Sequence, residues 1–125
     1  MIETLKGFPD NVIAVSAKGH VTKGDYRRVI APKLKAASRR HRKIRCYYEL
    51  GPEFSSMDSG ALWQDFKLGM ENLSRWERVA VVTDVEWIRA SMRVFRFFIA
   101  GEAKLFDTAQ AEEARRWIKA DLAST

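Results

Sequence analysis

Acidic and aromatic side chains gather directly after two of the predicted strands. They are Glu53, Phe54, Asp58, Ser59, Asp84 and Trp87. The first four follow a strand-like run at 44–50, and the last two follow another at 78–83. Because the carboxyl ends of parallel strands meet at one edge of a sheet, where open α/β folds bind their ligands, we expect these residues to form one rim. Such a mixture of acids and aromatics suits a small ligand or a peptide.

Four of these residues also have a purely structural interpretation. Asp84, like Asp107, stands where an aspartate caps a helix, and Asp58 or Ser59 could begin the helix that follows them. Trp87 could be an aromatic residue at the edge of the core. Taken one at a time, these residues favour the structural interpretation, and a binding rim is the alternative.

Groups for acid–base, nucleophilic or metal chemistry are few. The two histidines, His20 and His41, lie far apart in different predicted elements, and neither has a carboxylate at metal-ligand spacing. The sequence has no glycine-rich phosphate loop and no nucleophile elbow. Its single cysteine, Cys46, excludes an internal disulfide and a multi-cysteine metal site, and its place in a strand predicts a buried side chain. We therefore expect no enzyme activity, no metal and no cofactor.

The composition is that of a globular domain. Of 125 residues, 46% are apolar and 30% are charged, which provides a core for one domain over 1–125. No run approaches the roughly 18 apolar residues of a membrane span, and no charged and then apolar leader resembles a signal peptide. We expect a soluble, cytoplasmic protein.

Positive charge is concentrated in the first part of the chain. Residues 1–50 hold 12 Lys and Arg against 4 Asp and Glu, whereas residues 51–125 hold 10 against 12. The densest cluster contains Arg39, Arg40, Arg42 and Lys43. Such a cluster is usually a solvated helix end, where cations complement the helix dipole. The alternative is docking to an anionic membrane or to nucleic acid, of which nucleic acid is the less favoured partner.

Five strand-like runs alternate with helical ones. The runs are Ile2–Lys6, Val12–Lys18, Ile44–Leu50, Arg78–Thr83 and Ala103–Phe106. The order β-β-α-β-α-β-α-β-α predicts an α/β fold with a mainly parallel five-stranded sheet, whose first strand pairs antiparallel with the second at or near an edge. Alternation within 44–50 indicates that one face of that strand is partly wet or faces a ligand, whereas 78–83 has the pattern of burial on both faces.

Local signals mark the limits of the first helix. Thr22 with Asp25 resembles a capping box at its start. Pro32 removes a backbone donor and clashes with the preceding turn, so we expect a kink or break near Ala31.

A loop is expected over 51–57, and the helix after it has an apolar face. That face contains Leu62, Phe66, Met70 and Leu73. The next helix, 87–100, interleaves arginines with bulky aromatics, as interfacial and partner-docking helices do, and Gly101 is expected to cap its end. Ile88, Met92, Phe95 and Ile99 form a stripe that is expected to fill the core, and Phe97 or Phe98 is left outside that stripe. For that residue we favour contact in a homodimer or with a partner over contact with a membrane.

The order of elements and several motifs resemble one family. The motifs are Pro32 and the segments 48–54, 60–65 and 78–88. Together they are similar to SpoIIAA-like proteins, which are bacterial single-domain proteins related to the STAS fold of anti-sigma-factor antagonists. The resemblance runs from Ile2 to about Leu122. It implies a β-α superhelical α/β domain, related also to lipid-binding CRAL-TRIO domains, and it assigns no biochemical activity.

The antagonists carry an Asp-Ser-Ser-Gly-Leu-like motif directly after the third strand, and a partner kinase phosphorylates its serine. The segment 58–62 is similar, but it has one serine fewer and a seven-residue loop separates it from the strand. If this chain and the antagonists are aligned by the ends of their third strands, Gly51-Pro52-Glu53 takes the place of the motif. The resemblance thus implies phosphorylation of Ser59 if the motif itself aligns, with a helix cap as the alternative.

We expect a non-catalytic STAS-like regulatory or binding module that contacts a protein or a small ligand at the rim after the third and fourth strands. One alternative is a carrier of lipids or other apolar small molecules. A second alternative is electrostatic docking to an anionic membrane or nucleic acid through the segment 39–45. A homodimer is the expected assembly, because small modules of this kind often pair.

Overall fold

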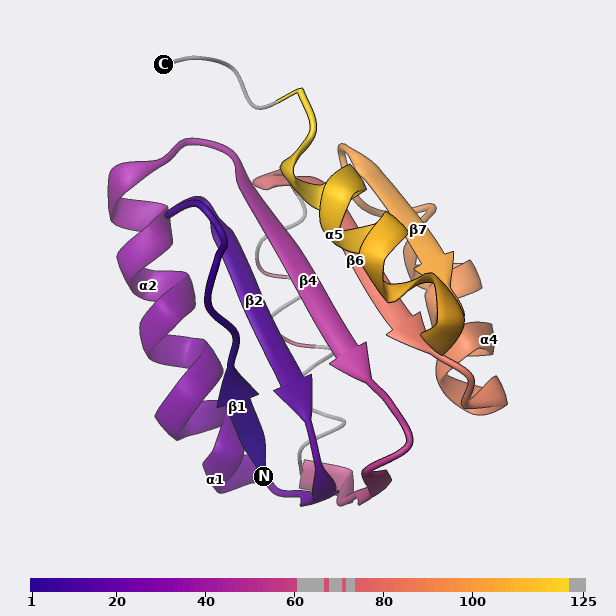
Figure 1. Ribbon diagram of the computed structural model, residues 1–125. Helices are drawn as coiled ribbons and strands as arrows, with labels where there is room; N and C mark the ends of the chain where they lie inside the picture. The colour runs from indigo at the N-terminus through magenta and orange to yellow at the C-terminus, as the bar shows by residue number, and fades with distance from the viewer. Residues whose placement is uncertain (61–66, 68–70, 72–73, 122–125) are drawn as a thin grey trace.

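A five-stranded sheet forms the centre of the fold. A computed structural model of the chain describes residues 1–60, 67, 71 and 74–121. The strands are β1 (Ile2–Thr4), β2 (Val12–Ala17), β4 (Ile44–Leu50), β6 (Trp76–Thr83) and β7 (Glu102–Phe106). They lie in the order β1-β2-β4-β6-β7, with β1 antiparallel to β2 and the other neighbours parallel (Figure 1). The predicted α/β fold and its antiparallel first strand are confirmed.

Helices cover both faces of this sheet. Their bounds are α1 (Lys23–Asp25), a π-helical turn (Tyr26–Ile30), α2 (Ala31–Arg40), α4 (Glu86–Phe95), a 3₁₀ turn (Thr108–Gln110) and α5 (Ala111–Lys119). Helix α5 packs on the face that is in front in Figure 1, through Ala114 and Ile118. Helices α2 and α4 pack on the opposite face, through Leu34 and Ile88. A further helix begins at Ser59.

The predicted apolar face of that further helix lies outside the described residues. It consists of Leu62, Phe66, Met70 and Leu73.

Strand β4 is covered on both faces. Tyr48 lies in the core beneath α2 and α4, whereas Tyr47 lies in the core beneath α5. Cys46 packs against the first core but is only half-buried, so the prediction of a buried cysteine is wrong in degree. Arg45, on the same face as Tyr47, is only 2% exposed. The predicted wet face is therefore wrong for Arg45 and Tyr47, although Glu49 is half-buried. A guanidinium and a phenol can be buried in this way because they find hydrogen-bond partners there.

The predicted break near Ala31 is wrong, and the helix instead has a π-helical irregularity just before Pro32. Helical conformation runs without a break from Lys23 to Arg40. In the π-helical turn before Pro32, the Ala31 N–H donates to the carbonyl of Tyr26, five residues back. Such a widened turn accommodates the proline, whose missing N–H and ring do not fit the ordinary spacing of four residues. The predicted capping box of Thr22 and Asp25 is confirmed at the start of α1.

A small second sheet replaces part of the predicted loop. Strand β3 (Gly19–Val21) pairs parallel with β5 (Phe54–Met57), so the loop prediction is wrong for 54–57. Phe54 anchors β5 because its side chain is buried in the core beneath α2 and α4. The Asp58 N–H donates to the Val21 carbonyl at 3.0 Å. The small sheet therefore leads directly into the helix that begins at Ser59.

Helix α4 is shorter than predicted. It ends at Phe95, so Gly101 does not cap it. A Cβ atom on Gly101 would lie 2.0 Å from the carbonyl oxygen of Glu77, and only glycine allows the two backbones to approach so closely. Phe97 and Phe98 lie in the turn between α4 and β7 and are 77% and 56% exposed. Both of them, rather than one, remain outside the core.

Candidate functional site

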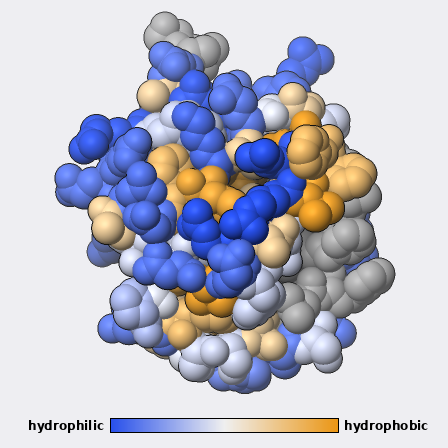
Figure 2. Space-filling model, turned by 90° about the vertical axis from the view of Figure 1, so that its right-hand side faces the viewer, coloured by the Kyte–Doolittle hydropathy of each residue, from blue (hydrophilic) through white to orange (hydrophobic). Residues whose placement is uncertain are grey.

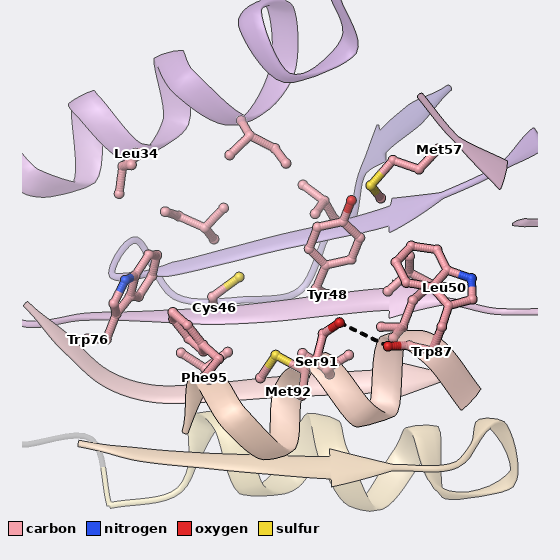
Figure 3. A pocket seen from close by; sticks show the side chains of 16 residues that line it. Leu34, Cys46, Tyr48, Leu50, Met57, Trp76, Trp87, Ser91, Met92 and Phe95 are labelled. Carbon is pink, nitrogen blue, oxygen red and sulfur yellow. Dashed lines mark hydrogen bonds between the residues drawn. The ribbon is translucent and has the colours of Figure 1, made fainter. Parts of the chain in front are cut away.

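An apolar cavity of about 340 Å³ lies between the sheet and the helices α2 and α4. Strand residues line it at Ile13, Val15, Cys46, Tyr48, Leu50, Met57, Trp76, Val79 and Val81. Helical residues line it at Ile30, Leu34, Trp87, Ile88, Ser91, Met92 and Phe95. Figure 3 shows the labelled side chains of α2, β4 and α4 turned toward one space.

Ordinary strand and helix periodicity places these side chains. Side chains alternate along a strand, so Cys46 and Tyr48 of β4 face the same side of the sheet. On α4, Met92 and Phe95 follow Ile88 at spacings of four and three, which keeps them on one side of the helix. The cavity therefore forms where a strand face and a helix stripe meet without filling the space between them.

Polar groups in the lining are few. The Tyr48 hydroxyl lies 2.6 Å from the hydroxyl of Tyr26. Ser91 Oγ donates to the Trp87 carbonyl at 2.9 Å (Figure 3). Among the lining residues that the structure describes, none has a charged side chain. This wall favours an apolar ligand, because a charged group would lose its hydration without gaining a counter-charge.

Of the six residues predicted to form the rim, all of which the structure describes, only Trp87 lines the cavity. It is 45% exposed and stands where β6 leads into α4. Leu50, the last residue of β4, lines the cavity as well. The cavity thus reaches the carboxyl ends of two parallel strands, where ligands of open α/β sheets bind.

The four predicted residues after β4 have other surroundings. Glu53 is exposed and pairs with Lys18 at 3.1 Å, whereas Phe54 is part of the core. Asp58 is half-buried at the end of β5, and Ser59 is exposed at the start of the next helix. Their role in a site, and phosphorylation of Ser59, stay predictions.

Asp84 lies just after β6 and is hydrogen-bonded to Thr108, just after β7. Its carboxylate accepts from the Thr108 N–H at 3.0 Å and from the Thr108 hydroxyl at 2.5 Å, and these bonds hold the pKa of Asp84 below its ordinary value. It does not cap α4, which begins after Val85. Asp107 forms a capping box with Gln110, as its structural interpretation predicts. Both aspartates therefore have structural partners.

The basic cluster lies at the C-terminal end of α2, and all four of its cationic residues are exposed. They are Arg39, Arg40, Arg42 and Lys43. Arg40 pairs with Asp10 at 3.4 Å, and Lys43 Nζ donates to the Ser74 carbonyl at 2.7 Å. The cluster lies at a solvated helix end, where the sequence predicts it, and docking through it stays a prediction.

A buried polar network on the α5 face was not predicted. Arg45 Nε donates to Glu77 at 2.6 Å, and Arg45 Nη1 donates to the Ile118 carbonyl at 2.9 Å. The Tyr47 hydroxyl donates to Glu49 at 2.6 Å. Burial, and then the bond to Glu49, raise the pKa of Tyr47 to about 12. This network holds α5 against the sheet, on the side opposite the cavity.

Sequence reasoning also missed most of the cavity lining. It assigned the stripe of Ile88, Met92 and Phe95 to a filled core. The available signal was Met92 on α4 facing the small Cys46 on β4, because flexible methionines line adaptable binding surfaces. That signal is weak on its own, since the same residues also fill ordinary cores.

Residues 1–60, 67, 71 and 74–121 contain neither a cluster of metal ligands nor a membrane-spanning helix. In this part of the chain, no group of three or more His, Cys, Asp or Glu is placed to hold a metal ion. Nor does it contain a helix with the length and apolar character needed to span a bilayer.

Comparison with known families identifies the fold. The model of the SpoIIAA-like family matches residues 12–119, from the first residue of β2 to the last residue of α5. The chain belongs to the SpoIIAA-like family. The resemblance found in the sequence motifs is therefore confirmed. Among proteins with curated descriptions, none matches this sequence.

A solved structure supports the same assignment. The SpoIIAA-like chain is similar to the crystal structure of an uncharacterised protein of the DUF3478 family, with a SpoIIAA-like fold, from Shewanella loihica PV-4. The two are 27% identical with a TM-score of 0.69, and the alignment covers 94% of this chain and 92% of that one. This likeness confirms the fold over nearly the whole sequence.

Proposed function

We propose that this SpoIIAA-like protein is a non-catalytic binding module for an apolar small molecule, held in the cavity between the sheet and the helices α2 and α4. The observation that carries the proposal is the lining, whose described residues are all aliphatic, aromatic or sulfur-containing except Ser91. Burial of apolar ligand surface against such a wall is favourable at about 25 cal/mol per Å². The ligand class follows from the chemistry of this wall.

The size of the cavity supports a single small ligand. Small-molecule sites in proteins occupy about 300–1,000 Å³, and this cavity of about 340 Å³ lies at the lower end of that range. A protein partner would instead bind over a larger surface, about 800 Å² per partner. The proposal therefore favours the small ligand over a protein partner for this site.

The shape supports an elongated ligand. Trp76, the first residue of β6, and Val81, near its end, both line the cavity. They are five residue steps apart along the strand, a length of about 16 Å at about 3.3 Å per residue. Figure 3 shows Trp76 at one end of the group of lining side chains and Trp87 at the other. An extended apolar molecule fits this run along the sheet, and the kinship with lipid-binding CRAL-TRIO domains favours the same class.

A pair of variants on one helix tests the proposal. Ser91 lines the cavity and is exposed, so Ser91→Trp places an indole in the opening without replacing a core residue. Ala90 is also exposed but is not among the described lining residues, so Ala90→Trp is the matched control. The probe is N-phenyl-1-naphthylamine, a neutral dye whose fluorescence rises in apolar surroundings.

We expect the wild-type protein to bind one equivalent of the dye. Ser91→Trp should weaken binding by about tenfold or more, equivalent to about 1.4 kcal/mol, whereas Ala90→Trp should stay within about twofold of the wild type. Absence of binding by the wild type would overturn the proposal. Equal weakening by both variants would show that the dye binds elsewhere on the helix, and would overturn it too.

A further inference from the structure

A turn with two exposed phenylalanines follows the helix that forms one wall of the cavity. Val94, Phe97 and Phe98 are 61%, 77% and 56% exposed. We name these three residues the aromatic turn: Phe97 and Phe98 lie in the turn itself, and Val94 lies in the last turn of α4 before them. Figure 2 views the molecule from the right-hand side of Figure 1 and shows apolar areas bordered by hydrophilic side chains on this face.

The exposure of the aromatic turn is built into the fold. The N–H of Phe97 donates to the Val94 carbonyl at 3.2 Å, and that of Phe98 donates to the Phe95 carbonyl at 2.9 Å. Ile99 directly after them is buried in the core. The backbone is therefore fixed on both sides of the two phenylalanines, which stand outward although exposure of such rings to water is unfavourable.

The charge around the aromatic turn is positive. The segment 86–98 contains three arginines and one glutamate. Arg93 is half-exposed and bonds to Glu86 at 3.2 Å, and the Arg96 guanidinium lies 5.5 Å from the centre of the Phe97 ring. The whole chain carries a net charge of +6. Exposed aromatic rings flanked by arginines match the apolar and anionic layers of a membrane surface containing acidic lipids.

We infer that the aromatic turn docks the protein on a membrane surface that contains anionic lipids. Phe97 and Phe98 enter the boundary between headgroups and acyl chains, and Arg93 and Arg96 contact the lipid phosphates. The inference goes beyond ligand binding in the cavity and does not depend on it. It also places the wall of the cavity, α4, next to the phase in which apolar molecules are dissolved.

A second copy of the chain fits this surface less well. The three side chains together expose roughly 350 Å², since an aromatic side chain contributes about 150–250 Å². A stable interface needs about 800 Å² from each partner. Two copies paired through this turn would also bring two positively charged segments together. The expected contact in a homodimer is therefore not favoured at this site.

Flotation with phospholipid vesicles tests the inference, using phosphatidylcholine alone and phosphatidylcholine mixed with phosphatidylglycerol. We expect the full chain to float with the anionic vesicles and to bind less as salt rises. Phe97→Ser/Phe98→Ser should lower the partition coefficient by tenfold or more, as estimated roughly from the apolar area withdrawn from water. Arg93→Gln/Arg96→Gln should lower it by about fivefold for each arginine.

Two controls separate this surface from the rest of the molecule. Arg39→Gln/Arg42→Gln removes the same charge from the basic cluster and should change the partition coefficient within about threefold. Phe97→Ser/Phe98→Ser should keep the unfolding temperature and the dye affinity of the cavity, because neither ring is among its described lining residues. Loss of both flotation and dye binding in this variant would mean that it is misfolded. Phe97→Tyr/Phe98→Tyr, which keeps the rings, must then float with the vesicles as the wild type does.

Three results would overturn the inference. The first is absence of wild-type flotation with anionic vesicles at low salt. The second is unchanged flotation of a folded Phe97→Ser/Phe98→Ser protein. The third is a homodimer, seen by sedimentation velocity, that this same substitution dissociates, since the turn would then be a protein interface.

Discussion

Replacing Arg45 with methionine removes the charged centre of the network beneath α5. The guanidinium makes four hydrogen bonds, to Glu77 and to the carbonyls of Ile118, Ala120 and Asp121. Three of these acceptors are carbonyls at or just beyond the end of α5, where a cation also complements the helix dipole. Methionine keeps most of the apolar stem, so the change isolates the loss of the charged donors.

The expected loss in the free energy of unfolding is about 3–5 kcal/mol, because three backbone carbonyls at the end of α5 lose a charged donor together. Hydrogen bonds to charged groups contribute about 1.5–3 kcal/mol each. Water can replace the donor at Glu77, whose side chain is 41% exposed, so the contributions of the four bonds do not add fully. For a chain of this length the loss corresponds to a fall in Tm of roughly 10–20 °C.

Urea unfolding followed by circular dichroism measures this loss. The control is Glu77→Gln, which keeps an acceptor for Arg45 Nε and should cost about 1 kcal/mol or less because the carboxylate is partly exposed. Below its Tm, Arg45→Met should bind the dye as the wild type does, because Arg45 lies on the face opposite the cavity. A loss under about 1 kcal/mol would refute the assignment of Arg45 as the anchor of α5.

Two further predictions concern the α5 face and the start of β7. Because the pKa of Tyr47 is raised from 10.0 to about 12, its contribution to stability is complete below pH 10 and is lost as the pH rises to 12, by about 2–3 kcal/mol. Urea unfolding at pH 9 and pH 11.5 should show this loss in the wild type but not in Tyr47→Phe, and equal losses would contradict it. Gly101→Ala forces the backbone away from Glu77 and should lower the free energy of unfolding by about 1–3 kcal/mol. Ala100→Ser, at an exposed neighbour, should leave that free energy unchanged, and a fully stable Gly101→Ala protein would show that the close approach is unimportant.

The strands of the main sheet could be predicted because each has its pattern within a few consecutive residues. The run Ile44–Leu50 is observed with its predicted bounds, and the order of elements determines which strands are parallel. Strand β5 could not be found in this way, because Phe54–Met57 becomes a strand only by pairing with β3, more than thirty residues earlier. Its four residues carry too little local preference without that partner.

The site was harder to predict than the fold. Trp87 was placed correctly at the carboxyl end of a strand, because topology alone brings it there. Arg45 has a charge that predicts exposure, yet α5 supplies carbonyl acceptors that allow its burial. Cys46 and Met92 have the residue types of a core. Whether such residues fill a core or surround a cavity depends on the distance between sheet and helix, which no local pattern encodes.

Native mass spectrometry after incubation with a lipid extract tests the central claim most directly. The account predicts one apolar molecule retained per chain in the wild type and in Ala90→Trp, with the adduct missing from Ser91→Trp, whose indole occupies the opening of the cavity. A wild-type protein that retains no adduct would contradict the account. Equal retention by Ser91→Trp would also contradict it, because the bound molecule would then lie outside the cavity.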